Sequence, residues 1–220
     1  IQTLRGPRIN ALPKDQYEVV VVDEFHHAAA SSYIQLLEHV EPIELVGMTA
    51  TPFRADGRDI TCWFEGRIAY ELPLWEAIDQ GFLCPFQYFG VTDDTDMQDL
   101  EWSGGDYRNI DSVVTGNTIR ADQSLRAIHE YVDRPSELRA LGFCASVAHA
   151  EFMAEHFSQR GTPSAFLSGE TPKEERDRIL ADLANGRVSV VFSVDVLGEG
   201  VDVPSVNTVL LLRPTQSATV

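Results

Sequence analysis

Hydrophobic residues in the first part of the chain gather in two short runs separated by an amphipathic stretch. The first run, Val19 to Val22, contains only β-branched residues, a composition typical of a strand buried on both faces. The second run covers residues 43–48, and residues 28–40 between the runs place apolar side chains at helical spacing. This pattern predicts two consecutive strands joined by a helix.

Predicted strands and helices alternate again in the second half of the chain. Strands are predicted for residues 141–145, 164–167, 188–194 and 206–212, and helices for residues 118–131, 146–160 and 172–184. Strands that alternate with helices indicate βαβ units around a parallel sheet, so we predict an α/β fold class. Between the two regions we expect a short helix at 74–80, an extended segment at 84–91, and a polar, acidic loop or linker outside any core at 92–118.

Composition and charge narrow the possible classes of protein. Hydrophobic residues make up 44% of the 220 residues and charged residues 23%, as in ordinary globular proteins. No apolar run approaches the roughly 18 residues of a membrane span, so we expect no membrane partner and a cytoplasmic location. The net charge of -17 counts against bulk attraction to nucleic acid, although a local groove of amides, hydroxyls and a few arginines remains compatible with it.

Polar residues follow both predicted strands of the first region. Asp23 and Glu24 come directly after the valine run, and Thr49 and Thr51 follow the second run. Since the carboxyl ends of parallel strands are where α/β sheets bind ligands, these residues are expected to lie at one edge. There, Asp23 could hold a hydrated Mg²⁺ and Glu24 could polarise a water for attack on a phosphate. The plain alternative is a strand followed by a solvated acidic turn.

The predicted strand at 188–194 also runs into residues suited to a ligand. Ser193 lies at its end, and Gly198 and Gly200 flank Glu199, which would let the backbone approach a ligand closely. Asp202 could accept a hydrogen bond from a ribose hydroxyl. A tight turn before a strand needs similar residues, so this pattern alone is weak.

Taken together, these motifs resemble those of a known family. Asp23-Glu24-Phe25-His26 is similar to the DExH form of helicase motif II, and Thr49 to Pro52 is similar to motif III. In the second half of the chain, Gly142 to Ser146 resembles motif IV and Phe166 to Gly169 resembles the short motif that follows it. Ser193 to Pro204 resembles motif V. Their order and spacing resemble superfamily 2 helicases of the restriction-subunit-like DEAD/DEAH-box group. Residues 56–59, 87–90 and 141–152 look most similar to bacterial helicases that carry an added phospholipase-D-like nuclease domain.

The resemblance implies a role for each matching residue. Asp23 would hold Mg²⁺ through water, Glu24 would be the catalytic base, and His26 would couple the nucleotide site to Thr49 and Thr51. The residues implied in binding are Ser146, Gly169, Ser193 and Arg54 for nucleic acid, and Gly200 and Asp202 for the nucleotide. Simpler explanations stay open: Ser146 is also an ordinary helix N-cap, residues 168–169 a common turn, and Arg54 a loop arginine.

The departures from the family pattern concern the phosphate-binding parts. A Walker A loop ends in Gly-Lys-Ser/Thr, but both lysines of the chain, Lys14 and Lys173, follow a proline. Beyond Val201 the only arginine is Arg213, whereas motif VI should supply arginine fingers, and Glu199 stands where many relatives carry arginine. We therefore expect an internal fragment of a longer polypeptide that has no ATPase activity by itself.

The resemblance implies a RecA-like (P-loop NTPase) architecture. The expected organisation is the C-terminal part of a first RecA-like domain at 1–81, an extended linker and entry to the second domain at 82–117, and most of a second RecA-like domain at 118–220. The longer protein would be an ATP-dependent helicase or translocase with ATP and Mg²⁺ as cofactors and DNA or RNA, with DNA favoured, as partner.

Two other classes of function stay open. The first is a RecA-like module that binds nucleic acid or protein without turnover. The second is a metal-dependent hydrolase in which Asp23, Glu24, His26 and His27 would be metal ligands.

Overall fold

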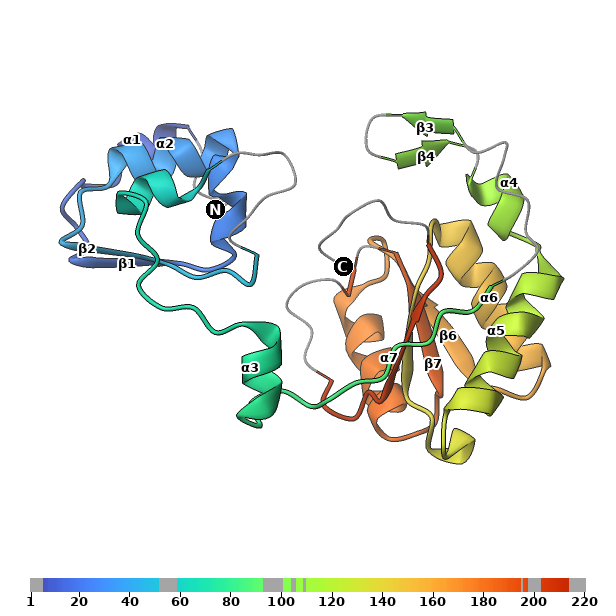
Figure 1. Ribbon diagram of the computed structural model, residues 1–220. Helices are drawn as coiled ribbons and strands as arrows, with labels where there is room; N and C mark the ends of the chain where they lie inside the picture. The colour runs from blue at the N-terminus through green and yellow to red at the C-terminus, as the bar shows by residue number, and fades with distance from the viewer. Residues whose placement is uncertain are drawn as a thin grey trace. The chain divides into compact units, whose positions relative to one another are not determined.

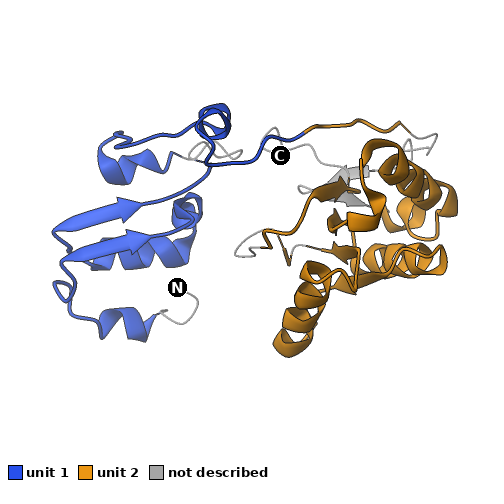
Figure 2. Ribbon diagram, turned by 90° about the horizontal axis from the view of Figure 1, so that it is seen from below, with its two compact units in different colours: residues 1–86, 216–220 blue, residues 87–215 orange. Residues whose placement is uncertain are grey.

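A computed structural model describes residues 6–51, 59–92, 101–103, 106–108, 110–194, 196–197 and 203–213. The chain divides into two compact units between Phe86 and Gln87 (Figure 2). None of the helices within the described ranges is both long enough and apolar enough to cross a membrane.

The first unit is built on a two-stranded parallel sheet. Its elements are α1 (Pro7–Asn10), β1 (Val19–Val22), the 3₁₀ helix η1 (Phe25–Ala29), α2 (Ser31–His39), β2 (Glu44–Gly47), the 3₁₀ helix η2 (Thr61–Phe64) and α3 (Leu74–Asp79) (Figure 1). β1 and β2 pair in parallel, with Val22 opposite Gly47. The prediction of two consecutive parallel strands joined by a helix is confirmed.

Within the described residues of this unit, helices cover one face of the sheet. Val22 is buried together with Phe25 and Leu37, whereas Val19 and Val21 are 56% and 55% exposed. The prediction that the valine run is buried on both faces is therefore wrong for the described unit. The reason is that successive residues of a strand point to opposite faces, and the described helices cover only one of the two.

Gly47 lets aromatic rings pack directly against the tip of β2. A Cβ atom at this position would lie 2.7 Å from Phe64 Cζ and 2.8 Å from the Phe25 ring. The two rings also contact each other, with centroids 4.9 Å apart. Phe25 is 1% exposed, so this packing fixes the start of η1 against β2.

The second unit is a parallel sheet with helices packed against it. Its elements are β3 (Glu101–Ser103), β4 (Asp106–Arg108), α4 (Ile110–Val114), α5 (Thr118–Tyr131), η3 (Pro135–Glu137), β5 (Ala140–Phe143), α6 (Val147–Gln159), β6 (Ser164–Leu167), α7 (Lys173–Ala184), β7 (Val190–Ser193) and β8 (Thr208–Leu211). The four parallel strands have the order β6-β7-β5-β8. Each predicted helix and strand of this region is present with similar bounds.

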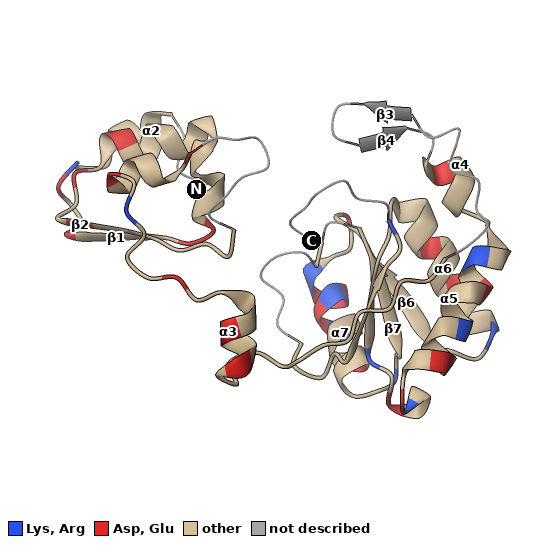
Figure 3. Cartoon of the chain, in the orientation of Figure 1, with Lys and Arg blue, Asp and Glu red and all other residues tan. Residues whose placement is uncertain are grey.

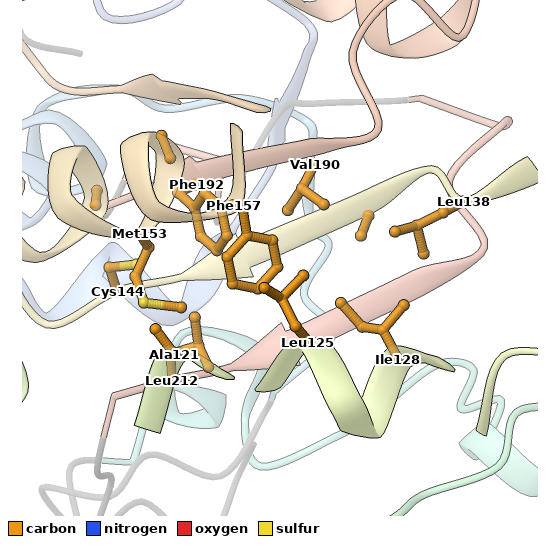
Figure 4. Close-up of a cluster of buried hydrophobic side chains, with 13 residues drawn as sticks. Ala121, Leu125, Ile128, Leu138, Cys144, Met153, Phe157, Val190, Phe192 and Leu212 are labelled. Carbon is orange, nitrogen blue, oxygen red and sulfur yellow. The ribbon is translucent and has the colours of Figure 1, made fainter. Parts of the chain in front are cut away.

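The core of this unit lies between the sheet and helices α5 and α6 (Figure 4). β7 is the strand buried along its whole length, because it lies between β6 and β5 and carries Val190, Val191 and Phe192. Phe157 of α6 meets Phe192 edge to face, with ring centroids 5.0 Å apart. Cys144 is fully buried in this core, and burial raises the pKa of its thiol to about 12.

The described residues between positions 92 and 118 include secondary structure that their composition did not indicate. β3 and β4 pair in antiparallel fashion, and α4 follows them. Ile110 and Val114 of α4 are buried. The expectation of a loop without core residues is thus wrong, because two apolar residues one helical turn apart are enough to attach a short helix.

Candidate functional site

The tips of β1 and β2 are joined by backbone hydrogen bonds. Met48 N donates to Val22 O at 2.9 Å, and Phe25 N donates to Met48 O at 2.8 Å. The chain leaving β1 therefore turns across the tip of β2. As a result, the Asp23-Glu24 pair and the Thr49 to Thr51 segment lie at the same edge of the sheet, as predicted.

Glu24 has a backbone conformation that is rare for its residue type. Its φ and ψ are both 49°, in the left-handed region. Asp23 Oδ1 accepts a hydrogen bond from Glu24 N at 2.9 Å, which stabilises the sharp turn out of β1. The Glu24 side chain is 40% exposed and so accessible to water.

His26 connects the acidic turn with the following strand. Its Nδ1 lies 3.1 Å from Thr49 Oγ1 and 3.3 Å from Glu24 Oε2. Thr49 Oγ1 also accepts a hydrogen bond from Thr51 N at 3.1 Å. Four residues predicted for the site therefore lie together: hydrogen bonds join His26, Thr49 and Thr51, and the Glu24 carboxylate lies beside the same His26 nitrogen.

Among the described residues of this edge, a metal ion could be held by single carboxylates but not by a cluster of ligands. Among the described residues there is no group of three or more His, Cys, Asp or Glu side chains arranged to hold a metal ion. His27 packs against the His26 ring instead, with centroids 4.1 Å apart and the two rings tilted by 46°. The ligand set required by the metal-dependent hydrolase alternative is thus not assembled. One carboxylate such as Asp23 still fits Mg²⁺, which commonly keeps several waters and binds proteins through one or two carboxylates.

The second unit presents three predicted residues at the carboxyl edge of its sheet. Ser146 follows β5, Gly169 follows β6 and Ser193 ends β7. These strands are neighbours in the order β6-β7-β5. The three residues therefore come from adjacent strand ends of one parallel sheet.

Ser146 has a structural role as the N-cap of α6. Its Oγ accepts a hydrogen bond from His149 N at 3.1 Å and caps the N-terminus of α6. This is the plain alternative that the sequence left open. A role in binding would have to be compatible with the cap.

Ser193 and Gly169 differ from Ser146 in their surroundings. Ser193 is 1% exposed, and its Oγ has no hydrogen-bond partner within the described part of the chain. A Cβ placed on Gly169 would meet nothing within 4 Å, so the space beside this residue is open. Its neighbour Ser168 donates its backbone N–H to Thr171 Oγ1 at 3.0 Å, which shapes the turn.

His149 is a residue of this edge that the sequence reading missed. It is 1% exposed, and its Nδ1 accepts a hydrogen bond from Ala145 N at 3.3 Å. Burial, followed by the charge of Arg120, lowers the pKa of His149 to about 4, so the ring is neutral at pH 7. The spacing of His149, Met153 and Phe157 on α6 is a helical signal that would have placed it on the buried face.

Three predicted site residues lie outside the described residues. They are Arg54 in the first unit and Gly200 and Asp202 after β7. Their implied roles stay predictions.

Comparison with known proteins gives two family matches. The family described as "Type III restriction enzyme, res subunit" matches residues 1–54, and the family described as "Helicase conserved C-terminal domain" matches residues 123–220. The two matches fall in different structural units and together cover most of the chain. Neither match tests the narrower resemblance to helicases with a phospholipase-D-like domain, which stays a prediction.

Individual relatives agree with these matches. A "51.5 kDa protein" of a Lactococcus phage is 32% identical over 201 residues, covering 90% of this chain and 43% of the relative. "Putative ATP-dependent helicase IRC3" of Saccharomyces cerevisiae is 26% identical over 224 residues, covering 99% of this chain and 32% of the relative. The chain thus spans less than half the length of these curated relatives.

A solved structure shows the fold. S. cerevisiae Dbp5 bound to RNA and ADP BeF3 superposes with a TM-score of 0.53 at 18% identity, covering 93% of this chain and 46% of that one. At this identity the likeness shows the architecture only. The fold is RecA-like α/β, as the resemblance implied.

Proposed function

We propose that this chain belongs to the restriction-subunit-like group of superfamily 2 DExH helicases, and that the longer protein it represents is an ATP-dependent helicase or translocase acting on nucleic acid. The observation that carries the proposal is the hydrogen-bonded edge of the first unit. There, Glu24, His26 and Thr49 are linked within 3.3 Å at the tips of two parallel strands. A solvated acidic turn would not require this connection to the next strand.

In the proposed reaction each residue of this edge has a distinct task. Mg²⁺ held through water by Asp23 would offset the charge of the triphosphate. Glu24, exposed at the strand tip, accepts a proton from the attacking water. His26 and Thr49 position Glu24 and transmit its change in charge to Thr51.

For the second unit we propose contacts with both nucleic acid and the nucleotide. Ser146, Gly169 and Ser193 would line the nucleic-acid side, and Gly200 and Asp202 would face ATP. The unpartnered, buried Ser193 Oγ supports a polar ligand at this edge. DNA is favoured over RNA because of the resemblance to restriction subunits, and affinities for single-stranded DNA and RNA at several salt concentrations would decide between them.

The domain assignment and location belong to the same proposal. Residues 1–81 and 118–220 would belong to successive RecA-like domains, and residues 82–117 would connect them. The exposed face of β1 and β2 would pack against further parts of the parent chain, since parallel sheets are covered on both faces. A cytoplasmic location stays a prediction; one relative, from Schizosaccharomyces pombe, is named as a mitochondrial helicase.

The decisive experiment replaces the proposed base. In the intact protein, Glu24→Gln should lower nucleic-acid-stimulated ATP hydrolysis by roughly 10²- to 10⁴-fold, because the amide cannot accept the proton. ATP binding should be retained, since Gln keeps the size of the side chain. The measurement is phosphate release together with nucleotide binding by fluorescence.

A matched control is Glu44→Gln, which makes the same chemical change on exposed β2 away from the strand tip. It should hydrolyse ATP at the normal rate. Unchanged stimulated hydrolysis in Glu24→Gln would remove Glu24 from the role of base. DNA binding without any turnover by the intact protein would favour the non-catalytic module instead. The 220-residue chain itself should release no phosphate, and steady release would contradict the expected inactivity of the fragment.

A further inference from the structure

A groove runs along α5 in the second unit, away from the residues discussed so far. Two adjoining hollows, of about 540 Å³ and 310 Å³, share Leu125, His129 and Thr162 as lining residues. One wall is α5, and the other is formed by the turn that joins α6 to β6. We call this feature the α5 groove.

The α5 groove lies at the opposite edge of the sheet from the candidate site. Its lining residues Leu138, Pro163 and Ser189 each come just before a strand, namely β5, β6 and β7. The candidate site uses the carboxyl ends of the same strands. The groove is therefore separate from the edge proposed to bind nucleotide and nucleic acid.

The floor of the groove is apolar and its rim is basic. Leu125, Ile128 and Leu138 line it and are buried, with exposed fractions between 2% and 7%. Arg126 and His129 are exposed on the rim, and within the described residues Arg126 makes no ion pair. Figure 3 shows both basic and acidic positions along α5.

Asp122, the one carboxylate among the residues that line the α5 groove, is already paired with positively charged or hydrogen-bonding side chains. Asp122 Oδ1 accepts a hydrogen bond from His156 Nε2 at 2.7 Å. The same oxygen forms an ion pair with Arg160 Nε at 2.6 Å. The hydrogen bond from His156 is the main cause that lowers the pKa of Asp122, and Arg160 adds to it. Asp122 thus holds Arg160 in place on the rim and leaves the charge of Arg126 uncompensated.

We propose that the α5 groove binds an acidic peptide segment of a partner protein, with an aliphatic or aromatic side chain seated on the Leu125 floor and a carboxylate meeting Arg126. An apolar centre with a polar rim is the usual anatomy of a protein interface. Charge complementarity selects an acidic segment, since a bidentate arginine–carboxylate pair is the strong form of such a contact. A local basic rim is notable on a chain of net charge -17.

A nucleic-acid backbone fits the groove less well. Two arginines would contact few phosphates, and the buried leucine and isoleucine floor offers no stacking platform for bases. A peptide uses both parts of the groove. Binding of single-stranded oligonucleotide is therefore an outcome that the experiment must separate.

The test selects ligands from a displayed library of random 12-residue peptides with the full chain as bait. Enriched peptides should be acidic and contain at least one large apolar residue. Their affinity, measured by fluorescence anisotropy, should fall at least tenfold for Arg126→Glu and by less for Arg126→Gln. Arg126 is exposed, so both variants should keep the helical circular dichroism of the parent chain.

The control variant is Arg178→Glu on α7, which makes the same charge change on a side chain that is 69% exposed and distant in sequence. It should bind the selected peptides normally. Three outcomes would overturn the proposal: peptides without acidic enrichment, equal weakening by Arg178→Glu, or oligonucleotide binding that is lost in Arg126→Glu. The two peptide outcomes leave the proposed helicase function untouched, because the groove and the candidate site are at opposite sheet edges, whereas ATP hydrolysis by the intact protein tests that function separately.

Discussion

At the scale of single residues, Glu24 combines an unusual backbone with the proposed chemistry. Only two non-glycine residues in the described ranges, Glu24 and Glu65, have positive φ. Such a conformation costs on the order of 1 to 3 kcal/mol and persists only where surrounding contacts impose it. Here the bonds from Phe25 N to Met48 O and from His27 N to Glu24 O impose it. The strained residue is thus held with its carboxylate beside His26.

His149 makes the stability of the second unit depend on pH. Its pKa is lowered to about 4 in the folded chain, against 6.5 for an ordinary histidine, so between these values the unfolded chain binds more protons. Stability is therefore full above pH 6.5 and falls as the pH drops toward 4, by up to about 3 kcal/mol. Urea unfolding between pH 4 and 7 measures this.

The His149→Gln variant serves as the comparison for that titration. Glutamine has no ionisable group, so the variant should be less stable at pH 7 but lose less stability on acidification. The comparison isolates the imidazole, because every other titratable group of the chain is the same in both proteins. Identical pH slopes for the two proteins would show that His149 is not the group responsible.

At the scale of elements, helix α6 begins at a residue with two proposed roles. Ser146 caps the helix through its bond to His149 N, and we also place Ser146 along the nucleic-acid groove. Substitutions can separate these roles, because aspartate caps a helix as well as serine does, whereas alanine does not. Only a contact with phosphate would be disturbed by the negative charge of aspartate.

Ser146→Ala should therefore lower the free energy of unfolding by about 1 kcal/mol, and Ser146→Asp should leave it nearly unchanged. In the intact protein, Ser146→Asp should nevertheless bind single-stranded DNA more weakly than the parent. Denaturant unfolding and DNA titration are the two measurements. Normal DNA affinity in Ser146→Asp would reduce Ser146 to a helix cap.

At the scale of the whole molecule, the two units differ in how well their sheets are covered. The first has two strands with one face exposed at Val19 and Val21, whereas the second has four strands around the fully buried β7. Two strands alone are marginal in water, and stability within a protein follows the density of buried contacts. The two units should therefore open independently.

Hydrogen exchange followed by mass spectrometry would test this difference in the 220-residue chain. Amides of β5 and β7 should exchange much more slowly than those of β1 and β2. Adding urea should release the first unit before the second. Equal protection of both sheets would contradict the independence of the units and indicate one cooperative fold.

Several features of the site were predictable because they depend on neighbours along the chain. The change from the valine run to Asp23-Glu24 marks a strand end, and the helical spacing of residues 118–131 matches α5 in both bounds. The one-sided burial of β1 and the burial of Ile110 and Val114 were not predictable in this way. They depend on which distant elements cover each face.

The sequence by itself determined the alternation of strands and helices, the family and the residue types at each strand tip, since these follow from local periodicity and motif order. Only the tertiary structure decided that His26 lies between Glu24 and Thr49, that His149 is buried and neutral, and that Arg126 and Arg160 border one groove. Each of these facts depends on parts of the chain that are distant in sequence and that packing brings together. Such contacts arise from packing, which no local pattern records.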